Sequence, residues 1–261
     1  MDLSLTGRNA VICGSTQGIG LGIAQELAML GANCILIARD QARLEKCTIE
    51  LPRSAEQIHE FRVADFTNTE EVKHAINSVT AEKTVHILIN NTGGPAPGPI
   101  AEAGTDVFTA AFSQHIVNNQ HLVQAVMPGM KQAGFGRIIN VISTSVRIPL
   151  KNLGVSNTIR GAVASWAKSL SNEVGRFGIT VNNVLPGFTE TARLDSLIRS
   201  MAADRHCSED DVRTQLSEDV PAGRFGRVAE VAALAAFLAS PAASYINGTS
   251  IPVDGGRTGS I

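Results

Sequence analysis

The chain has 261 residues, of which 44% are hydrophobic and 18% are charged, a composition typical of globular proteins and unlike that of disordered ones. Its 22 Lys and Arg against 24 Asp and Glu give a formal net charge of -2, which disfavours nucleic acid as the main partner. The longest apolar run, residues 231–239, is too short to cross a membrane.

The first residues, Met1 to Ser4, contain no basic start and no apolar core of a secretion signal. The cysteines are scattered without a Cys-x-x-Cys pair, and the six histidines do not fall at metal-ligand spacing. The sequence therefore predicts a cytoplasmic protein with no metal site and no disulfide framework.

Short β-branched runs alternate along the chain with stretches of helical periodicity. Strands are predicted at residues 10–13, 33–37, 85–89, 137–142, 179–184 and 250–253. Helices are predicted at residues 19–30, 68–82, 159–174 and 228–239. The strand runs are apolar almost throughout, as expected when both faces of a parallel sheet are covered. This order predicts an α/β fold with a doubly wound parallel sheet, in a single domain over residues 1–261.

The polar segment 188–219 interrupts this alternation and shows only weak helical periodicity. Long insertions are uncommon in compact domains unless they cover a binding site. We expect a substrate lid at residues 188–219; the alternative is a solvated pair of surface helices.

A glycine-rich turn joins the first predicted strand to the first predicted helix. Glycines there permit a tight turn, let the backbone approach a phosphate and let the helix pack closely on the strand. The helix N-terminus then offers free N–H groups to a pyrophosphate. This context predicts a dinucleotide site that includes Gly14, Ser15, Gln17, Gly18, Ile19 and Gly20.

The end of the second strand selects between the two nicotinamide dinucleotides. It reads Ile37-Ala38-Arg39, with no carboxylate to accept from the ribose 2′-hydroxyl of NAD. Arg39 favours NADP because its guanidinium can pair with the 2′-phosphate. The alternative is a solvent-facing arginine, and the neighbouring Asp40 is expected to turn away.

Several motifs in their usual order resemble the short-chain dehydrogenase/reductase family, most closely its β-ketoacyl-acyl carrier protein reductases. They are Gly14-x-x-x-Gly18-Ile19-Gly20, Asp65, Asn90-Asn91-Thr92-Gly93, Pro186-Gly187 and, near the end, residues 220–226 and 245–256. The resemblance implies a Rossmann-type sheet of about seven parallel strands, a nicotinamide cofactor across the strand ends and a homotetramer. It further implies cofactor contacts at Asp65, Phe66, Asn91, Gly93, Gly187 and Thr189.

The family's catalytic positions are changed in this sequence. The resemblance implies an Asn, a Ser and a Tyr-x-x-x-Lys pair around the substrate carbonyl. Alignment places Ser143 at the serine, Ser156 at the tyrosine, Arg160 at the lysine and His115 at the asparagine. The one tyrosine in the chain, Tyr245, belongs to the C-terminal motif.

These changes leave the source of a proton open. A serine hydroxyl is a much weaker acid than a phenol, and loss of a general acid costs about 10²–10⁴-fold in rate. Arg160 can still bind the nicotinamide ribose but cannot relay a proton. The remaining donors are His115, a water held by Ser143 and Ser156, or none.

Two functions remain open. The first is an NADP(H)-dependent oxidoreductase acting on a small carbonyl or alcohol; the second is a catalytically silent relative that binds dinucleotide as a sensor or assembly subunit. An acyl carrier protein is disfavoured, because the arginines that dock it in relatives align with Gly134 and Phe177. The segment after Phe188 could hold an anionic substrate, although interleaved acids favour a salt-bridged surface for Arg193, Arg199, Arg205 and Arg213.

Overall fold

One parallel sheet of seven strands organises the computed structural model, which describes residues 1–54 and 56–259. The strand order is β3-β2-β1-β4-β5-β6-β7, and each neighbouring pair is parallel. The chain order reverses between β1 and β4, which is the switch point where ligands bind in such sheets. The strands are β1 (Asn9–Cys13), β2 (Asn33–Ala38), β3 (Glu60–Val63), β4 (Ile87–Asn90), β5 (Gly136–Val141), β6 (Ile179–Pro186) and β7 (Ser250–Val253).

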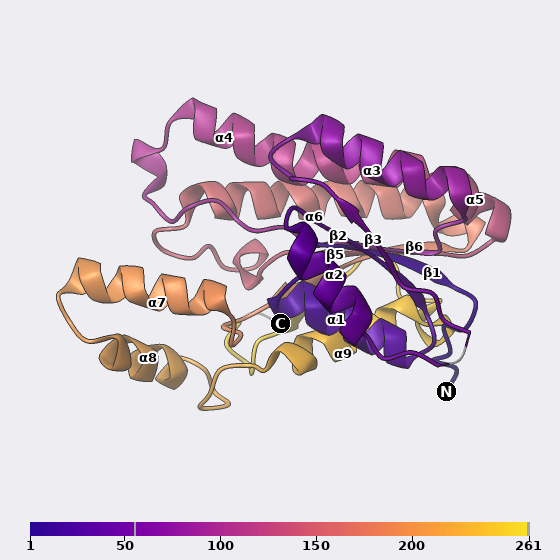
Figure 1. The fold of residues 1–261 in the computed structure, drawn as a ribbon. Helices are drawn as coiled ribbons and strands as arrows, with labels where there is room; N and C mark the ends of the chain where they lie inside the picture. Colours follow the sequence, from indigo (N-terminus) through magenta and orange to yellow (C-terminus); the bar gives the residue numbers. More distant parts are fainter. Residues whose placement is uncertain (55, 260–261) are drawn as a thin grey trace.

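Helices cover both faces of the sheet (Figure 1). One face carries α3, α5 and α6, and the other carries α1 and α9, which pack on each other. The helices are α1 (Gly18–Met29), α2 (Gln41–Glu50), α3 (Thr69–Glu82), α4 (Thr105–Phe112), α5 (Asn118–Ala133), α6 (Gly154–Val174), α7 (Ala192–Arg205), α8 (Glu209–Glu218) and α9 (Val228–Ala239).

The strands feed two separate apolar cores. In β1, Ala10 and Ile12 belong to the core under α1 and α9, whereas Val11 and Cys13 belong to the core under α3, α5 and α6. This alternation follows from the two-residue period of a strand. Double coverage explains the continuous apolar runs, and the predicted doubly wound α/β fold is confirmed.

The edge strand β3 was not predicted from the residue pattern. It presents Glu60 and Arg62, which are joined by an ion pair on a half-buried strand. Lys83 also pairs with Glu60, and Glu82 pairs with Arg62, so ion pairs add to the apolar packing of Phe61 at this edge. Helices α2, α4 and α5 were also absent from the predicted elements.

Side-chain amides link four strands across the sheet. Asn90 Nδ2 donates to Asn140 Oδ1 at 2.8 Å, and Asn140 Nδ2 donates to Asn183 Oδ1 at 2.9 Å. Asn183 Nδ2 then donates to Ser250 Oγ at 2.9 Å. Each donor and acceptor is a direct backbone neighbour in the register of the paired strands.

The segment 188–219 contains the two helices α7 and α8, which pack on each other beside the sheet (Figure 1). They share a small apolar cluster of their own, which includes Leu194, Ile198, Val212, Leu216 and Phe225. The pair therefore packs largely through its own contacts and those of Phe225. In the described part of the chain, no helix is long and apolar enough to span a bilayer.

Candidate active site

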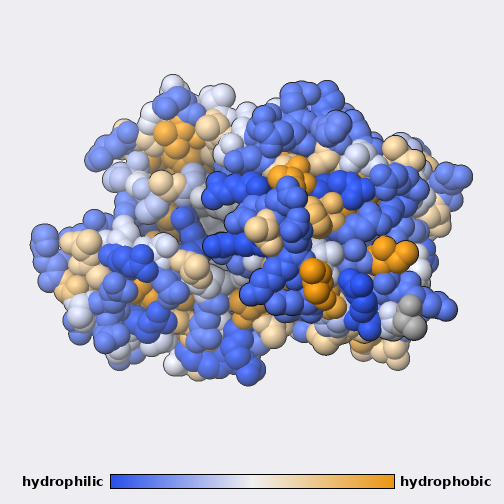
Figure 2. Space-filling view, in the orientation of Figure 1, coloured by the Kyte–Doolittle hydropathy of each residue, from blue (hydrophilic) through white to orange (hydrophobic). Residues whose placement is uncertain are grey.

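A cavity of about 710 Å³ lies at the carboxyl ends of the strands and is lined by the loops that follow them. Its size is that of a cofactor or small-molecule site. Figure 2 shows the surface hollowed between the region of α4 and the α7–α8 pair. The position matches the expected site beside the switch point between β1 and β4.

The glycine turn is shaped for close approach of a phosphate. Gly14 and Gly18 have φ values of 60° and 52°, in the left-handed region that side chains disfavour. A Cβ on Gly14 would lie 2.4 Å from the Asn91 carbonyl oxygen, and one on Gly20 would lie 2.2 Å from the Gly14 carbonyl oxygen. Among the residues that the structure describes, no side chain caps the N-terminus of α1 at Gln17, so its first N–H groups remain available to an anion. The turn therefore fits a dinucleotide diphosphate.

The predicted turn residues divide into two groups. Gly14, Gln17, Gly18 and Ile19 line the cavity. Ser15 and Gly20 lie outside the lining. Ser15 is fully buried with its hydroxyl directed at the Ile37 carbonyl oxygen, 3.5 Å away. Gly20 brings α1 against the turn, so both residues shape the site from behind.

Arg39, Asp65 and Phe66 also line the cavity. The Asp65 carboxylate accepts hydrogen bonds from the Thr67 backbone N–H and hydroxyl, both at 2.9 Å. These bonds, together with the Arg39 charge, hold the pKa of Asp65 below its usual range. Asp40 instead caps α2 by accepting from the Arg43 N–H at 3.1 Å, so it turns away as expected.

The predicted residues after β4 and β6, Asn91, Gly93, Gly187 and Thr189, also line the cavity. Asn91 Nδ2 donates to the carbonyl oxygens of Cys13 and Gly14, both at 3.2 Å, and so ties the end of β4 to the glycine turn. The Thr189 hydroxyl donates to the Gly187 carbonyl oxygen at 3.2 Å.

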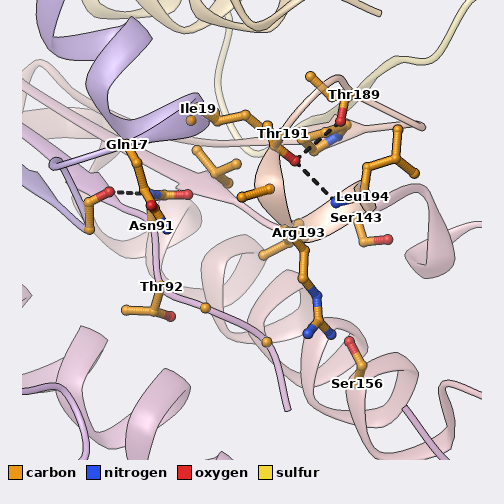
Figure 3. Close-up of a pocket in the computed structure, with 18 of the residues that line it drawn as sticks. Gln17, Ile19, Asn91, Thr92, Ser143, Ser156, Thr189, Thr191, Arg193 and Leu194 are labelled. Carbon is orange, nitrogen blue, oxygen red and sulfur yellow. Dashed lines mark hydrogen bonds between the residues drawn. The ribbon is translucent and has the colours of Figure 1, made fainter. Parts of the chain in front are cut away.

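Thr191 is a cavity residue that sequence reasoning missed. Its hydroxyl accepts from the Leu194 N–H at 3.4 Å and donates to the Thr189 carbonyl oxygen, which fixes the first turn of α7 (Figure 3). A threonine directly before a helix is a capping signal that could have found it.

The three predicted catalytic positions line the same cavity. Ser143 follows β5, while Ser156 and Arg160 are one turn apart on α6, and all three line the cavity. Arg160 is 8% exposed and donates to the carbonyl oxygens of Val141 and Thr92 at 3.1 and 3.3 Å. Burial and the neighbouring charge of Arg193 lower the Arg160 pKa to about 10, so its guanidinium stays protonated at neutral pH.

His115 has a different environment. It lies in a π-helical turn, Ser113–Val117, is buried and does not line the cavity. Its Nδ1 is 2.7 Å from the Thr92 hydroxyl, and burial followed by the Arg160 charge lowers its pKa to about 3. The imidazole is therefore neutral at physiological pH, which disfavours His115 as a general acid. Tyr245 is fully exposed and also lies outside the cavity lining.

The four arginines of segment 188–219 separate into two kinds. Arg199 pairs with Glu209 and Arg213 with Asp195, and Arg205 donates to Gln215, so these three follow the expected polar surface. Arg193 lines the cavity instead, and its Nη2 donates to the Pro95 carbonyl oxygen at 2.8 Å.

A model of the family described as Enoyl-(Acyl carrier protein) reductase matches residues 14–258. The chain belongs to the short-chain dehydrogenase/reductase family. It is 32% identical to a tropinone reductase homologue of Arabidopsis thaliana, over 98% of this chain and 77% of that one. It is 30% identical to the NADPH-dependent reductase BacG of Bacillus subtilis, over 97% of this chain and 99% of that one.

Solved structures agree with this assignment. L-sorbose reductase of Gluconobacter frateurii, complexed with NADPH and L-sorbose, superposes with a TM-score of 0.93 at 28% identity, covering 100% of both chains. An actinorhodin polyketide ketoreductase with NADPH gives a TM-score of 0.90 at 28% identity, covering 97% of this chain and 98% of that one. The chain is thus an NAD(P)-dependent oxidoreductase by family, and its relatives support NADP as the cofactor.

Proposed function

We propose that this protein is an NADP(H)-dependent oxidoreductase acting on a small carbonyl or alcohol substrate, with an atypical active centre of Ser143, Ser156 and Arg160. The observation that carries the proposal is their presence in the same cavity as a glycine turn that fits a dinucleotide diphosphate. The resemblance to the family implies a tyrosine and a lysine at the positions of Ser156 and Arg160.

The cavity lining supplies a candidate contact for each part of NADP. The glycine turn would hold the diphosphate, and the guanidinium of Arg39, which has no ion pair within the described residues, would suit the 2′-phosphate. When bound, the nicotinamide supplies a hydride to a carbonyl carbon or accepts one from an alcohol. The holding residues are Gly14, Gln17, Gly18 and Ile19 at the diphosphate, Arg39 at the 2′-phosphate, Asp65 and Phe66 at the adenine, Asn91 and Gly93 at the ribose, and Gly187 and Thr189 at the carboxamide.

The chain's own residues can stabilise charge on the substrate oxygen without a phenol. Ser143 Oγ accepts from the Ser145 N–H at 3.0 Å, which leaves its own proton free to donate to a carbonyl oxygen. Ser156 offers a second hydroxyl donor from α6, and Arg160 adds a buried positive charge. Such fixed donors and charges act most strongly where water is excluded.

We assign the proton to a water that the two serine hydroxyls would hold; it would give a proton to the substrate oxygen and regain one from solvent. His115 is disfavoured because its imidazole is neutral and lies outside the cavity lining. Arg160 holds its proton at neutral pH. Without a positioned general acid, we expect turnover about 10²–10⁴-fold below that of a reductase that has one.

The same features support a second candidate, a relative that binds dinucleotide but is catalytically silent. Its basis is that the single tyrosine of the chain, Tyr245, is fully exposed and outside the cavity lining. We favour the enzyme because Ser143 and Ser156 keep their hydroxyls in the cavity beside a charged arginine.

One set of variants separates the two candidates. Calorimetry measures NADPH binding, and the absorbance of NADPH follows reduction of a panel of small ketones and aldehydes. The enzyme predicts NADPH binding, measurable turnover by the unmodified protein and slower turnover by Ser143→Ala. Turnover seen only in the double variant Ser156→Tyr with Arg160→Lys would establish the silent relative. Absence of NADPH binding would refute both.

The oligomeric state, the cellular location and the role of residues 188–219 complete the proposal. The resemblance to the family supports a homotetramer, which sedimentation analysis tests directly. The composition of the chain supports action in the cytoplasm. The α7–α8 pair, which contributes Arg193 and Leu194 to the cavity lining, supports a substrate lid over residues 188–219. Hydrogen exchange in this segment should slow when NADPH and substrate bind.

A further inference from the structure

Two guanidinium groups converge beside Ser156. Gly94 marks the place, because a Cβ on it would lie 3.3 Å from Arg160 Nη2, 3.7 Å from Ser156 Oγ and 3.9 Å from Arg193 Nη2. Arg160 reaches this point from α6 and Arg193 from the first turn of α7. Two like charges and a hydroxyl donor thus surround one part of the cavity.

Neither arginine has a carboxylate partner among the described residues. Arg160 donates to two backbone carbonyl oxygens, and Arg193 donates to one through Nη2. On the same helix pair, Arg199 and Arg213 lie in ion pairs with Glu209 and Asp195. Carboxylates therefore neutralise Arg199 and Arg213 at the surface, whereas Arg193 in the cavity has no such partner within the described residues.

The acidic residues that line the cavity, Asp65 and Glu190, form no ion pair with Arg160 or Arg193 within the described residues. Asp65 is hydrogen bonded to Thr67 and is close enough to Arg39 for that charge to lower its pKa. Glu190 is exposed and close enough to Arg224 for its charge to raise the pKa of that arginine. The charges of Arg160 and Arg193 repel each other, and a bound anion would relieve this repulsion.

We propose that Arg193, with the charge of Arg160 behind it, binds a carboxylate group of the substrate, so that the reacting molecule is a small keto acid or hydroxy acid. This inference rests on the proposed oxidoreductase function and names its substrate class. The planar fork of arginine matches a carboxylate with two parallel hydrogen bonds. Arg193 Nη2 gives one of its two hydrogens to Pro95, and Nε and Nη1 have no partner within the described residues, so the second Nη2 hydrogen can pair with the adjacent Nε–H or Nη1–H to hold a carboxylate.

The placement favours the substrate over the diphosphate of the cofactor as the anion. Figure 3 shows the Arg193 guanidinium directed toward Ser156 and away from Gln17 and Ile19 of the glycine turn. The free N–H groups of α1 already serve a diphosphate at that turn. An anion at Arg193 would instead lie beside Ser156, where the carbonyl of a substrate is proposed to bind.

The test measures binding, so it does not depend on turnover. Calorimetry is used to titrate the protein, with and without saturating NADP⁺, with the α-keto and γ-keto acids of a six-carbon chain and with their primary amides. We expect at least one acid to bind about tenfold more tightly than its amide. Arg193→Gln should weaken binding of that acid about 10- to 100-fold and leave amide and NADP⁺ affinity within about twofold.

Arg199→Gln is the matched control, because it removes the same charge from the same helix on the solvent side, and it should change none of these affinities. Equal affinities of acids and amides, or no binding of either, would overturn the proposal. Loss of NADP⁺ affinity in Arg193→Gln would assign the arginine to the cofactor instead. Failure of the oxidoreductase function would be recognised separately, as absent NADPH binding or absent turnover by the unmodified protein.

Discussion

Arg39→Gln is the substitution that tests the choice of cofactor most directly. Arg39 follows β2, is exposed and lines the cavity. It forms no ion pair with any of the described residues. Asp65 is near enough for the Arg39 charge to lower its pKa. Removing the guanidinium therefore has two effects on a bound 2′-phosphate. It deletes an attractive charge, and it leaves the Asp65 carboxylate to repel the phosphate.

The size of the effect follows from the exposure of the side chain. Hydrogen bonds between charged partners contribute about 1.5–3 kcal/mol. Solvent screening at an exposed arginine reduces this to about 1–2 kcal/mol, which corresponds to a loss of about 5- to 30-fold in affinity. NADH has no 2′-phosphate, so its affinity should change less than about twofold.

Calorimetric titration with NADPH and NADH measures both affinities, at low and at high salt. The ratio of NADPH to NADH affinity of the unmodified protein should fall at high salt, because salt screens the contact between Arg39 and the 2′-phosphate. Lys46→Gln is the control, because Lys46 is an exposed cation paired with Glu50 on the nearby α2. An unchanged ratio of NADPH to NADH affinity in Arg39→Gln would refute the assignment of the 2′-phosphate to this arginine.

Three further substitutions test the surrounding structure. Gly20→Ala places a methyl group 2.2 Å from the Gly14 carbonyl oxygen, so we expect a loss of about 1–3 kcal/mol in urea unfolding together with weaker NADPH binding. Retention of both would show that the turn can yield. For His115 the folded-state pKa of about 3 lies below the unfolded value near 6.5, so protonation of the unfolded chain removes stability as pH falls between them. The free energy of urea unfolding should therefore fall less in His115→Asn than in the unmodified protein between about pH 6.5 and 3. An equal fall in both proteins would contradict this. Leu216→Ala should speed proteolysis within residues 192–218, since it opens the separate apolar cluster there, and unchanged cleavage would mean that α7 and α8 are held by other contacts.

The sheet was predictable from sequence where strands are buried on both faces. Five of the predicted strands, β1, β2, β4, β5 and β6, have apolar runs because two cores receive alternate residues of the same strand, whereas the sixth, β7, is partly buried and packs against one core. The seventh, β3, was invisible to that signal because its place at the edge is held by the ion pairs of Glu60 and Arg62. Helix α5 has a long polar face, and Pro128 lies inside it, which weakens its signal in the sequence.

The site was predictable where backbone shape determines it. Glycines at fixed spacing located a turn that lines the cavity, but spacing could not separate Gly18, which lines the cavity, from Gly20, which supports the turn from behind. Arg193 was grouped with three other arginines because each has acids nearby in sequence. Only the structure shows that the start of α7 directs this side chain into the cavity, whereas later turns direct theirs to solvent. Side-chain direction at the first turn of a helix depends on the entry angle of the chain, which a residue pattern does not encode.

The hydrogen-bonded side chains from Asn90 to Ser250 favour one register of the strands that carry them. Every amide donates toward β7, so reversing one of them would set donor against donor or acceptor against acceptor with a neighbouring amide. A strand inserted one residue out of step would turn its asparagine toward the opposite core. Each amide stranded there would cost about 1–3 kcal/mol. Apolar side chains tolerate a small shift of register between strands, whereas these amides disfavour any register of β4, β5, β6 and β7 other than the observed one.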